Sequence, residues 1–184
     1  MVVNPKKYQS FAAGSIVAIL ELLFKTTIVL GEKISRTGLH KYLVDELNSP
    51  SQNSKISKTV YELKRSGYLL FENDSVRLTN KAKMRIVDQV AAKSGKCKKY
   101  HLVSFDIPEI KRVERNRFRR AIKRMGFVQI QKSLWVSNKN IGHLVDAATE
   151  EYRVSDYVAY FVSESSNIDR FIAKNIRDNK YRAK

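Results

Sequence analysis

Residues 100–109 have the sequence YHLVSFDIPE, a hydrophobic run that ends on a carboxylate and a proline. The run from Tyr100 to Asp106 predicts a buried strand, and Pro108 marks the turn that follows it. Further along, MGFVQIQKSLWV at 125–136 adds a glycine after a basic segment and two short strand candidates. These two stretches decide the fold of the second half of the chain.

The elements around them follow a regular order. A helix rich in Arg and Lys is expected from Pro108 to Met125, then strands near FVQI and LWVS, the helix IGHLVDAATEEY and the strand YVAYFV. This β-α-β-β-α-β order is the split pattern of a ferredoxin-like domain. Two helices would cover one sheet face and leave the other for a partner. A terminal helix with Ser166 and Asp169 at capping-box spacing is expected to pack on a domain or a partner.

The sequence of the first half of the chain predicts three helices. Apolar residues at helical spacing indicate one helix over about Ser10 to Lys25 and a second that Ser35 can cap. Ser54 can cap the third helix, and Gly67 is expected to end it.

A hairpin and a linker follow these helices. The strands YLLFE and SVRLT are joined by Asn73-Asp74, a pair suited to a tight turn. From Thr79 a basic helix leads to KSGKCKK, which is typical of a hinge. We therefore predict an α+β protein with two domains, 1–95 and 96–184.

The charge of the chain favours a polyanionic partner. Lys and Arg number 35 against 18 acids, the net charge is +17, and both halves are basic. Such a surplus attracts nucleic acid, so double-stranded DNA is the expected partner. A surface that only confers solubility is the alternative, and an acidic membrane is a weaker one because no lipidation motif accompanies the charge.

Cysteine, histidine and targeting signals add exclusions. The single Cys97 excludes an internal disulfide and a cysteine-clustered zinc site, and the three histidines lack metal-binding spacing. The apolar stretch from Phe11 is interrupted by Glu21 and Lys25, and no cleavage site follows it. We expect a cytoplasmic, nucleoid-associated protein without a membrane segment.

The segment VYELKRSGYLLFENDSVRLTNKAK resembles the end of the recognition helix and the wing of a winged helix-turn-helix domain, and the resemblance covers about residues 10–85. It implies that the third helix enters the major groove. The base-facing candidates are Lys55, Ser57, Lys58 and Tyr61. The backbone-facing candidates are Lys64, Arg65 and Arg77. The alternatives are a helix whose lysines only face solvent, and a domain that binds proteins.

YHLVSFDIPE, the arginine-rich helix and MGFVQIQKSLWV resemble two related groups over about residues 98–165. One is the small dimeric CRISPR-associated subunit that joins the spacer integrase. The other is the central domain of the phenylacetate-catabolism repressor family, PaaX, which follows an amino-terminal winged helix. The proline after FDI, the tryptophan in QKSLW and the domain order favour the PaaX-like family.

Asp106 has a different role under each resemblance. In the CRISPR-associated group the matching aspartates of two subunits face each other, and a divalent ion between them is linked to nuclease activity. That resemblance implies Asp106 as a catalytic and metal-binding residue, since one carboxylate alone holds Mg²⁺ weakly. The alternative is structural, with Asp106 accepting backbone N–H bonds and capping the next helix.

The helix after Pro108 carries seven cations within about four turns, which suits the backbone of a duplex. Arg115, Arg119 and Lys123 are our DNA-binding candidates there, against the alternative of a solvated face. Gln131, Ser133 and Trp135 are expected to hold the strands and a dimer interface, although Trp135 could also stack on a base.

These observations predict a homodimeric DNA-binding transcription regulator, a repressor that needs no cofactor. Its third helix would bind the operator, and its ferredoxin-like domain would form the dimer. The alternative is a CRISPR-adaptation protein, either a Mg²⁺-dependent endonuclease that uses an Asp106 pair or a subunit that bridges an integrase partner.

Overall fold

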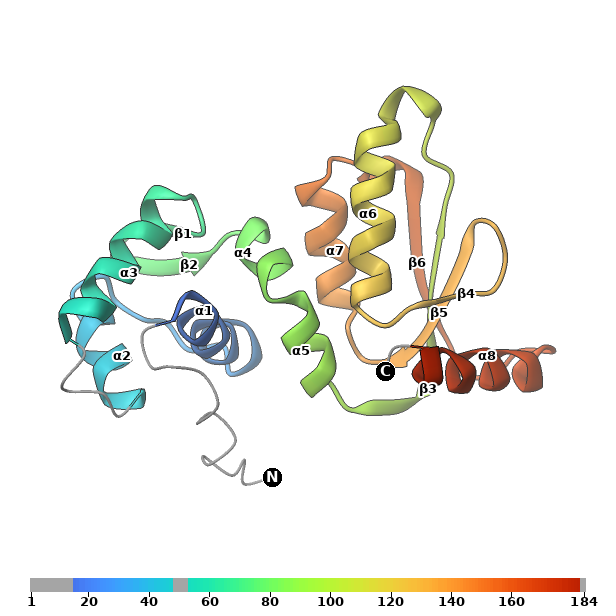
Figure 1. The fold of residues 1–184 in the computed structure, drawn as a ribbon, viewed down its shortest axis with the longest axis horizontal. Coiled ribbons are helices and arrows are strands. Elements are labelled where there is room, and N and C mark those ends of the chain that lie inside the picture. Colours follow the sequence, from blue (N-terminus) through green and yellow to red (C-terminus); the bar gives the residue numbers. More distant parts are fainter. Residues whose placement is uncertain (1–14, 48–52, 183–184) are drawn as a thin grey trace. The chain divides into compact units, whose positions relative to one another are not determined.

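The computed structural model describes residues 15–47 and 53–182, and the chain divides into two compact units, Met1–Ile86 and Val87–Lys184 (Figure 1). Both contain helices and strands, which confirms the α+β class. The division lies earlier than the predicted one at 95 and 96. The expected linker helix is in fact two helices, α4 (Asn80–Arg85) in the first unit and α5 (Val87–Lys93) in the second, where α5 packs against the later helix α6.

The helices of the first unit are α1 (Ile16–Phe24), α2 (Leu39–Glu46) and α3 (Asn53–Arg65). Ser15 caps α1 through the N–H of Ala18, at 3.2 Å, and the helix continues into a π-helical turn, η2 (Lys25–Val29). The residues expected to begin this helix, from Ser10, lie outside the described part of the chain.

Neither α2 nor α3 has the serine cap that was predicted for it, and the residue before α2 is Gly38, which provides no side-chain cap. The hydroxyl of Ser35 accepts the N–H of Gly38, at 2.9 Å, directly before α2. Ser54 does not cap α3, because the helix already includes Asn53. Gly67 follows α3 with a φ of +70°, a left-handed conformation that glycine adopts without strain.

The hairpin of the first unit consists of β1 (Leu69–Glu72) and β2 (Ser75–Leu78). Asn73 and Asp74 form the turn with φ angles of 45° and 59°, as a two-residue hairpin turn requires. The segment before α2 joins this hairpin, since Ser35 forms a bridge with Ser75 and the N–H of Val76 donates to the carbonyl of Ile34.

Apolar side chains from all three helices and the hairpin fill the core of the first unit. The fully or almost fully buried members include Leu20, Leu23, Leu43, Ile56, Leu63 and Leu69.

Among the described helices of both units, none has the length and apolar character needed to cross a bilayer.

The second unit is a four-stranded antiparallel sheet with helices. The sheet has the order β4-β5-β3-β6. The elements in chain order are β3 (Lys96–Phe105), η4 (Glu109–Lys111), α6 (Arg112–Arg124), β4 (Val128–Gln129), β5 (Leu134–Lys139), α7 (Gly142–Glu151), η5 (Ser155–Tyr157), β6 (Val158–Ser163) and α8 (Asp169–Arg182).

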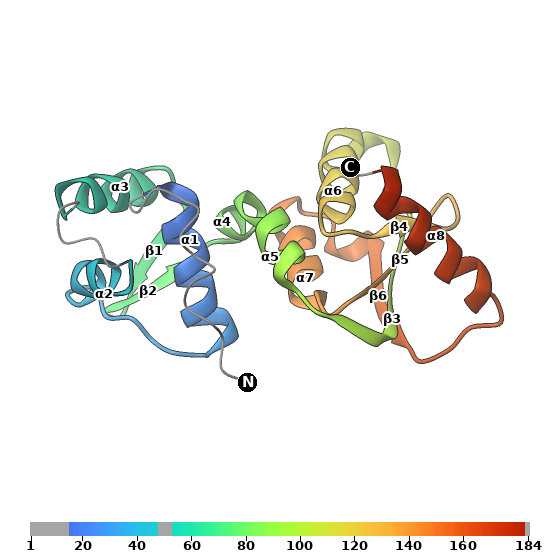
Figure 2. The same ribbon diagram turned by 60° about the horizontal axis from the view of Figure 1, so that its bottom comes forward.

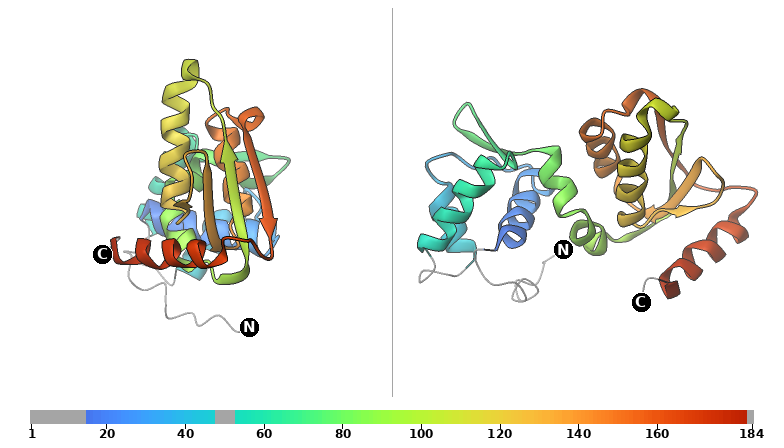
Figure 3. Two further views of the ribbon diagram at one scale, coloured as in Figure 1. Left: turned by 90° about the vertical axis from the view of Figure 1, so that its right-hand side faces the viewer. Right: turned by 45° about the horizontal axis from the view of Figure 1, so that its top comes forward.

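Helices α6 and α7 lie side by side on one face of this sheet (Figure 1). Phe118 of α6 is fully buried there and meets Phe105 of β3 edge-on, with ring centroids 5.4 Å apart. Helix α8 packs against β4 and β5 on the opposite face (Figures 2 and 3). Its buried Ile172 explains the amphipathic pattern of the tail.

Candidate nucleic-acid interface

All six candidates on α3 are exposed. Because Ile56 and Leu63 are buried, helical spacing directs Ser57, Lys58, Tyr61, Lys64 and Arg65 away from the core. Lys55 lies on the flank of this outer side. Tyr61 is 64% exposed, an unusual position for a large aromatic residue in a small domain. The outer side of α3 therefore combines cations, a hydroxyl and a free aromatic ring.

The two arginines of the first unit that were expected to contact the DNA backbone have acidic neighbours. Arg65 pairs with Glu62 at 2.7 Å, and Arg77 pairs with Glu72 at 2.9 Å. Both pairs are largely exposed, so each contributes little to stability and can exchange a carboxylate for a phosphate.

Arg36 was not among the residues predicted to bind DNA. Its guanidinium lies over the ring of Phe71 at 5.9 Å, and the ammonium of Lys64 lies over the same ring at 5.4 Å. The backbone N–H of Arg36 donates to the carbonyl of Asp74 in the hairpin turn. The ring of Phe71 thus lies within cation–π distance of both Arg36, which precedes α2, and Lys64 of α3. The only signal in the sequence was the basic residue in SRTG before the second helix.

On α6 the three candidates differ in their surroundings. Arg115 donates to Glu109 at 2.6 Å and to the carbonyl of Ile107 at 3.2 Å, and its side chain is largely covered. Arg119 and Lys123 are exposed. Arg115 therefore holds the turn after β3, while Arg119 and Lys123 remain on the surface. The neighbouring Arg115 lowers the pKa of the Glu109 carboxyl through this hydrogen bond.

Asp106 follows the central strand β3 and is exposed. Its backbone N–H donates to the carbonyl of Tyr157 at 3.1 Å. The capping interpretation is wrong, because η4 begins after Pro108 and α6 after Lys111, and neither start has a side-chain cap. Within the described residues its carboxylate has no hydrogen bond or ion pair.

Two cavities meet at Asp106. One, of about 690 Å³, is also lined by Arg115, Arg119, Lys132 and Ser133, and the other, of about 390 Å³, extends toward Ala159 of β6. In the described part of the chain no three metal-ligating side chains come together. The larger cavity thus combines the carboxylates of Asp106 and Glu109 with three cations, Arg115, Arg119 and Lys132.

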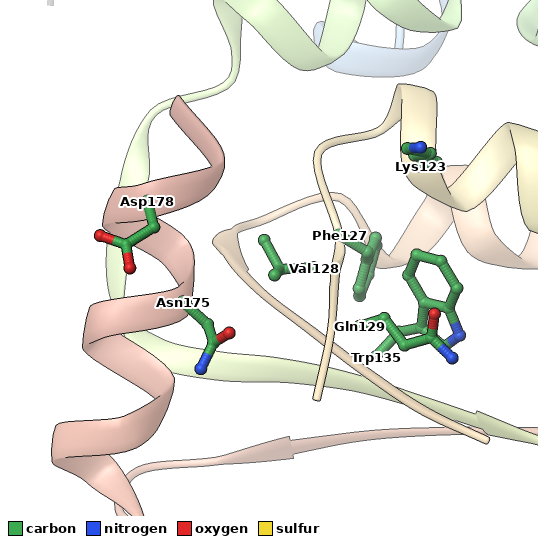
Figure 4. A pocket seen from close by; sticks show the side chains of 7 residues that line it. All are labelled: Lys123, Phe127, Val128, Gln129, Trp135, Asn175 and Asp178. Carbon is green, nitrogen blue, oxygen red and sulfur yellow. The ribbon is translucent and has the colours of Figure 1, made fainter. Parts of the chain in front are cut away.

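Trp135 is 5% exposed, so base stacking by this residue is wrong. It lies between β5 and α6 and lines a cavity of about 260 Å³ with Lys123, Phe127 and Gln129 (Figure 4). Val128 points to the other side of β4, toward Asn175 of α8 (Figure 4). Trp135 is a core residue whose indole N–H has no hydrogen-bond partner in the described chain. Gln131 and Ser133 are exposed near the β4–β5 turn.

The buried histidine of β3 has a structural environment. His101 bonds through Nδ1 to the hydroxyl of Tyr160 and through Nε2 to the Sγ of Cys97, at 3.2 Å. Burial lowers the pKa of His101 and raises the pKa of Tyr160. The imidazole is therefore neutral at neutral pH and links β3 to β6.

The second unit matches a known family. Residues 96–173 match the family model described as the PaaX protein central Cas2-like domain. No curated protein matches this chain significantly. The match begins at the first residue of β3, includes the sheet with α6 and α7, and ends within α8. From β3 into α8, the chain is thus similar to the central Cas2-like domain of PaaX proteins.

Proposed function

We propose that this protein is a dimeric DNA-binding transcriptional repressor of the PaaX type. In this proposal the first unit is a winged helix-turn-helix domain, and the second is a ferredoxin-like domain that forms the dimer. The observation that carries the proposal is the outer side of α3, where Lys58, Tyr61 and Lys64 project from a helix braced by a hairpin. The family match and the net charge of +17 also support it.

The proposed chemistry follows from these side chains. The ammonium groups of Lys58 and Lys64 would neutralise phosphates, which provides affinity and salt dependence. Ser57 and Tyr61 would contact base edges in the major groove, which provides sequence preference. Arg36, Arg65 and Arg77 flank this surface and would fix its orientation on the duplex.

The proposed dimer interface is the part of the sheet face that α8 does not cover. Phe161 of β6 is 45% exposed there, and Ala159 beside it is also exposed. Burying this apolar surface against a second copy would set two α3 helices on one palindromic site. Sedimentation of Phe161→Asp should give a monomer where the wild-type chain gives a dimer, and a wild-type monomer at micromolar concentration would contradict this step.

The test of the main proposal begins with DNA fragments selected from the source genome by the wild-type protein. Lys58→Ala with Lys64→Ala should weaken binding to the selected fragment by tenfold or more, on the order of the loss of two phosphate contacts. Arg170→Ala with Lys174→Ala on the exposed side of α8 removes the same charge and should leave affinity nearly unchanged. Equal affinities of the two double variants would refute the proposal.

A second candidate function rests on Asp106. Its carboxylate lacks a partner within residues 15–47 and 53–182 and borders a cavity with two arginines, a surrounding that suits a phosphodiester. Two copies across a dimer axis could hold Mg²⁺ and activate water. Cleavage of duplex DNA in Mg²⁺ or Mn²⁺ that Asp106→Asn abolishes would support a nuclease. No cleavage by the wild-type protein would leave Asp106 without this role.

A further inference from the structure

A second group of arginines lies on α6, on the side that faces α7. Arg117, Arg120 and Arg124 line a cavity of about 370 Å³ together with Ala121 and Tyr152. Tyr152 directly follows the last residue of α7, and α7 lies beside α6 (Figure 1). Folding therefore brings one aromatic residue from a distant segment to three cations.

The three arginines share a cavity with Tyr152 and act on its electrostatics. Burial raises the pKa of Tyr152, and the charge of Glu151 raises it further. The positive charges of Arg124, Arg117 and Arg120 act in the opposite direction and lower this pKa. An anion at the phenolic oxygen of Tyr152 would be attracted by the same three positive charges and repelled by Glu151.

The three arginines differ in what holds them. Arg124 donates to both carboxylate oxygens of Asp88 in α5, with the shortest distance at 2.6 Å, so its guanidinium is oriented. Arg117 and Arg120 are exposed, and across the described chain neither has an ion pair or a side-chain hydrogen bond. One fixed and two available guanidinium groups therefore surround a phenol.

This combination fits a phosphate group. Guanidinium groups bind phosphate oxygens through parallel N–H bonds, and a tyrosine O–H can donate to a third oxygen. Among the described residues that line the cavity, Ala121 alone is aliphatic, so these residues do not form the apolar walls that hold the body of a small organic ligand. The exposure of Arg117 and Arg120 instead allows an extended polyanion to approach.

We propose that Arg117, Arg120 and Tyr152 bind a backbone phosphate of duplex DNA flanking the sequence that α3 contacts. This inference rests on the proposed function, and it assigns a phosphate site to the α7 side of α6 in addition to the candidates Arg115, Arg119 and Lys123. Because a phosphate contact carries no base information, the site adds affinity without adding sequence preference.

The test measures how the affinity of the full chain for DNA depends on salt. Arg117→Ala with Arg120→Ala should lower the slope of log K against log salt by about 0.9, the change expected for the loss of one phosphate contact. The ratio of affinities for the selected and a scrambled duplex should not change. Arg170→Ala with Lys174→Ala is the matched control and should keep the wild-type slope. A slope equal to that of the control would overturn the inference.

Two further measurements separate the remaining outcomes. Tyr152→Phe keeps the ring and every charge, so it should weaken binding severalfold with an unchanged slope, and wild-type affinity would remove Tyr152 from the site. Calorimetric titration with inorganic pyrophosphate tests a small phosphate compound. Pyrophosphate binding that requires Arg117 and Arg120, together with an unchanged DNA slope, would overturn the DNA assignment.

Failure of the proposed function has a different signature. In that case the wild-type chain would bind the selected and scrambled duplexes equally, or the Lys58 and Lys64 variant would keep full affinity. The slope of the Arg117 and Arg120 variant can still be measured on either duplex. A reduced slope would then support the phosphate site alone.

Discussion

Helices α3 and α6 each contain thirteen residues and have a basic surface, but their cations have different neighbours. On α3 the lysines point to solvent, and Arg65 has only an exposed neighbour, Glu62. On α6, Arg115 ties the helix to the turn after β3, and Arg124 ties it to α5. A basic helix in a sequence therefore indicates charge, whereas the availability of that charge depends on acids elsewhere in the chain.

The largest expected difference concerns the cores beneath these helices. Leu63→Ala should destabilise the first unit by about 2–5 kcal/mol, and Phe118→Ala should destabilise the second by about 3–5 kcal/mol, because both side chains are fully buried. Urea unfolding can be followed by circular dichroism for the whole chain. Fluorescence of Trp135, the one tryptophan of the sequence, reports the second unit.

Phe118→Ala should shift the fluorescence transition, and Leu63→Ala should leave it in place. Ile56→Val, a smaller truncation in α3, should cost only about 0.5–1.5 kcal/mol and serves as the control. If Leu63→Ala moved both transitions equally, the two units would unfold as one, and the comparison of separate cores would not hold.

The stability of the second unit should depend on pH. Burial lowers the pKa of His101, so the folded chain binds fewer protons there than the unfolded chain. The contribution of His101 to the free energy of unfolding is complete above the ordinary histidine pKa of about 6.5. It decreases as the pH falls below that value. The urea midpoint from Trp135 fluorescence should decrease from pH 7.5 to 5.5.

His101→Gln should be less stable at pH 7.5 because Tyr160 and Cys97 lose a buried partner, but it should lack most of this pH dependence. His40→Gln in the first unit, where His40 is not buried, provides the control. An unchanged slope in His101→Gln would show that other groups carry the acid sensitivity.

The coupling energies of the ion pairs on the two helices should differ by a smaller amount than the core effects. A double-mutant cycle for Arg124 and Asp88 should give a coupling near 1 kcal/mol, since two guanidinium nitrogens bond both carboxylate oxygens. The cycle for Arg65 and Glu62 on α3 should give about 0.2–0.5 kcal/mol. Equal couplings would mean that the second contact of Arg124 adds nothing in solution.

The smallest effect is expected at Asp106. Because its carboxylate caps no helix, Asp106→Asn should change stability by no more than about 0.5 kcal/mol. Glu109→Gln, which weakens a hydrogen bond to Arg115, is the comparison in the same turn. A large loss in Asp106→Asn, measured by urea unfolding, would indicate a structural contact after all.

Much of the secondary structure could be predicted from local patterns. The turn at Asn73-Asp74, the end of α3 at Gly67 and the strand before Asp106 depend on backbone preferences and hydrophobic runs that adjacent residues carry. The break between α4 and α5 at Ile86 was missed. The sequence of this segment is typical of one amphipathic helix, whereas in the structure the buried Ile86 is the last residue of the first unit.

The outer side of α3 was identified because helical spacing alone separates it from the buried Ile56 and Leu63. Local order, the class of fold and the side chains that face outward from one helix therefore followed from the amino-acid sequence. Asp106 was recognised in the same way, as the residue that ends a strand.

The partners of these side chains required the folded chain. Arg36 over Phe71, Tyr152 among the arginines of α6 and the bare carboxylate of Asp106 depend on segments that are far apart in sequence. No periodic pattern encodes such contacts, because they arise when a sheet and its helices pack in three dimensions. The sequence placed the charges on their helices, and packing determined which of them remain available to a ligand.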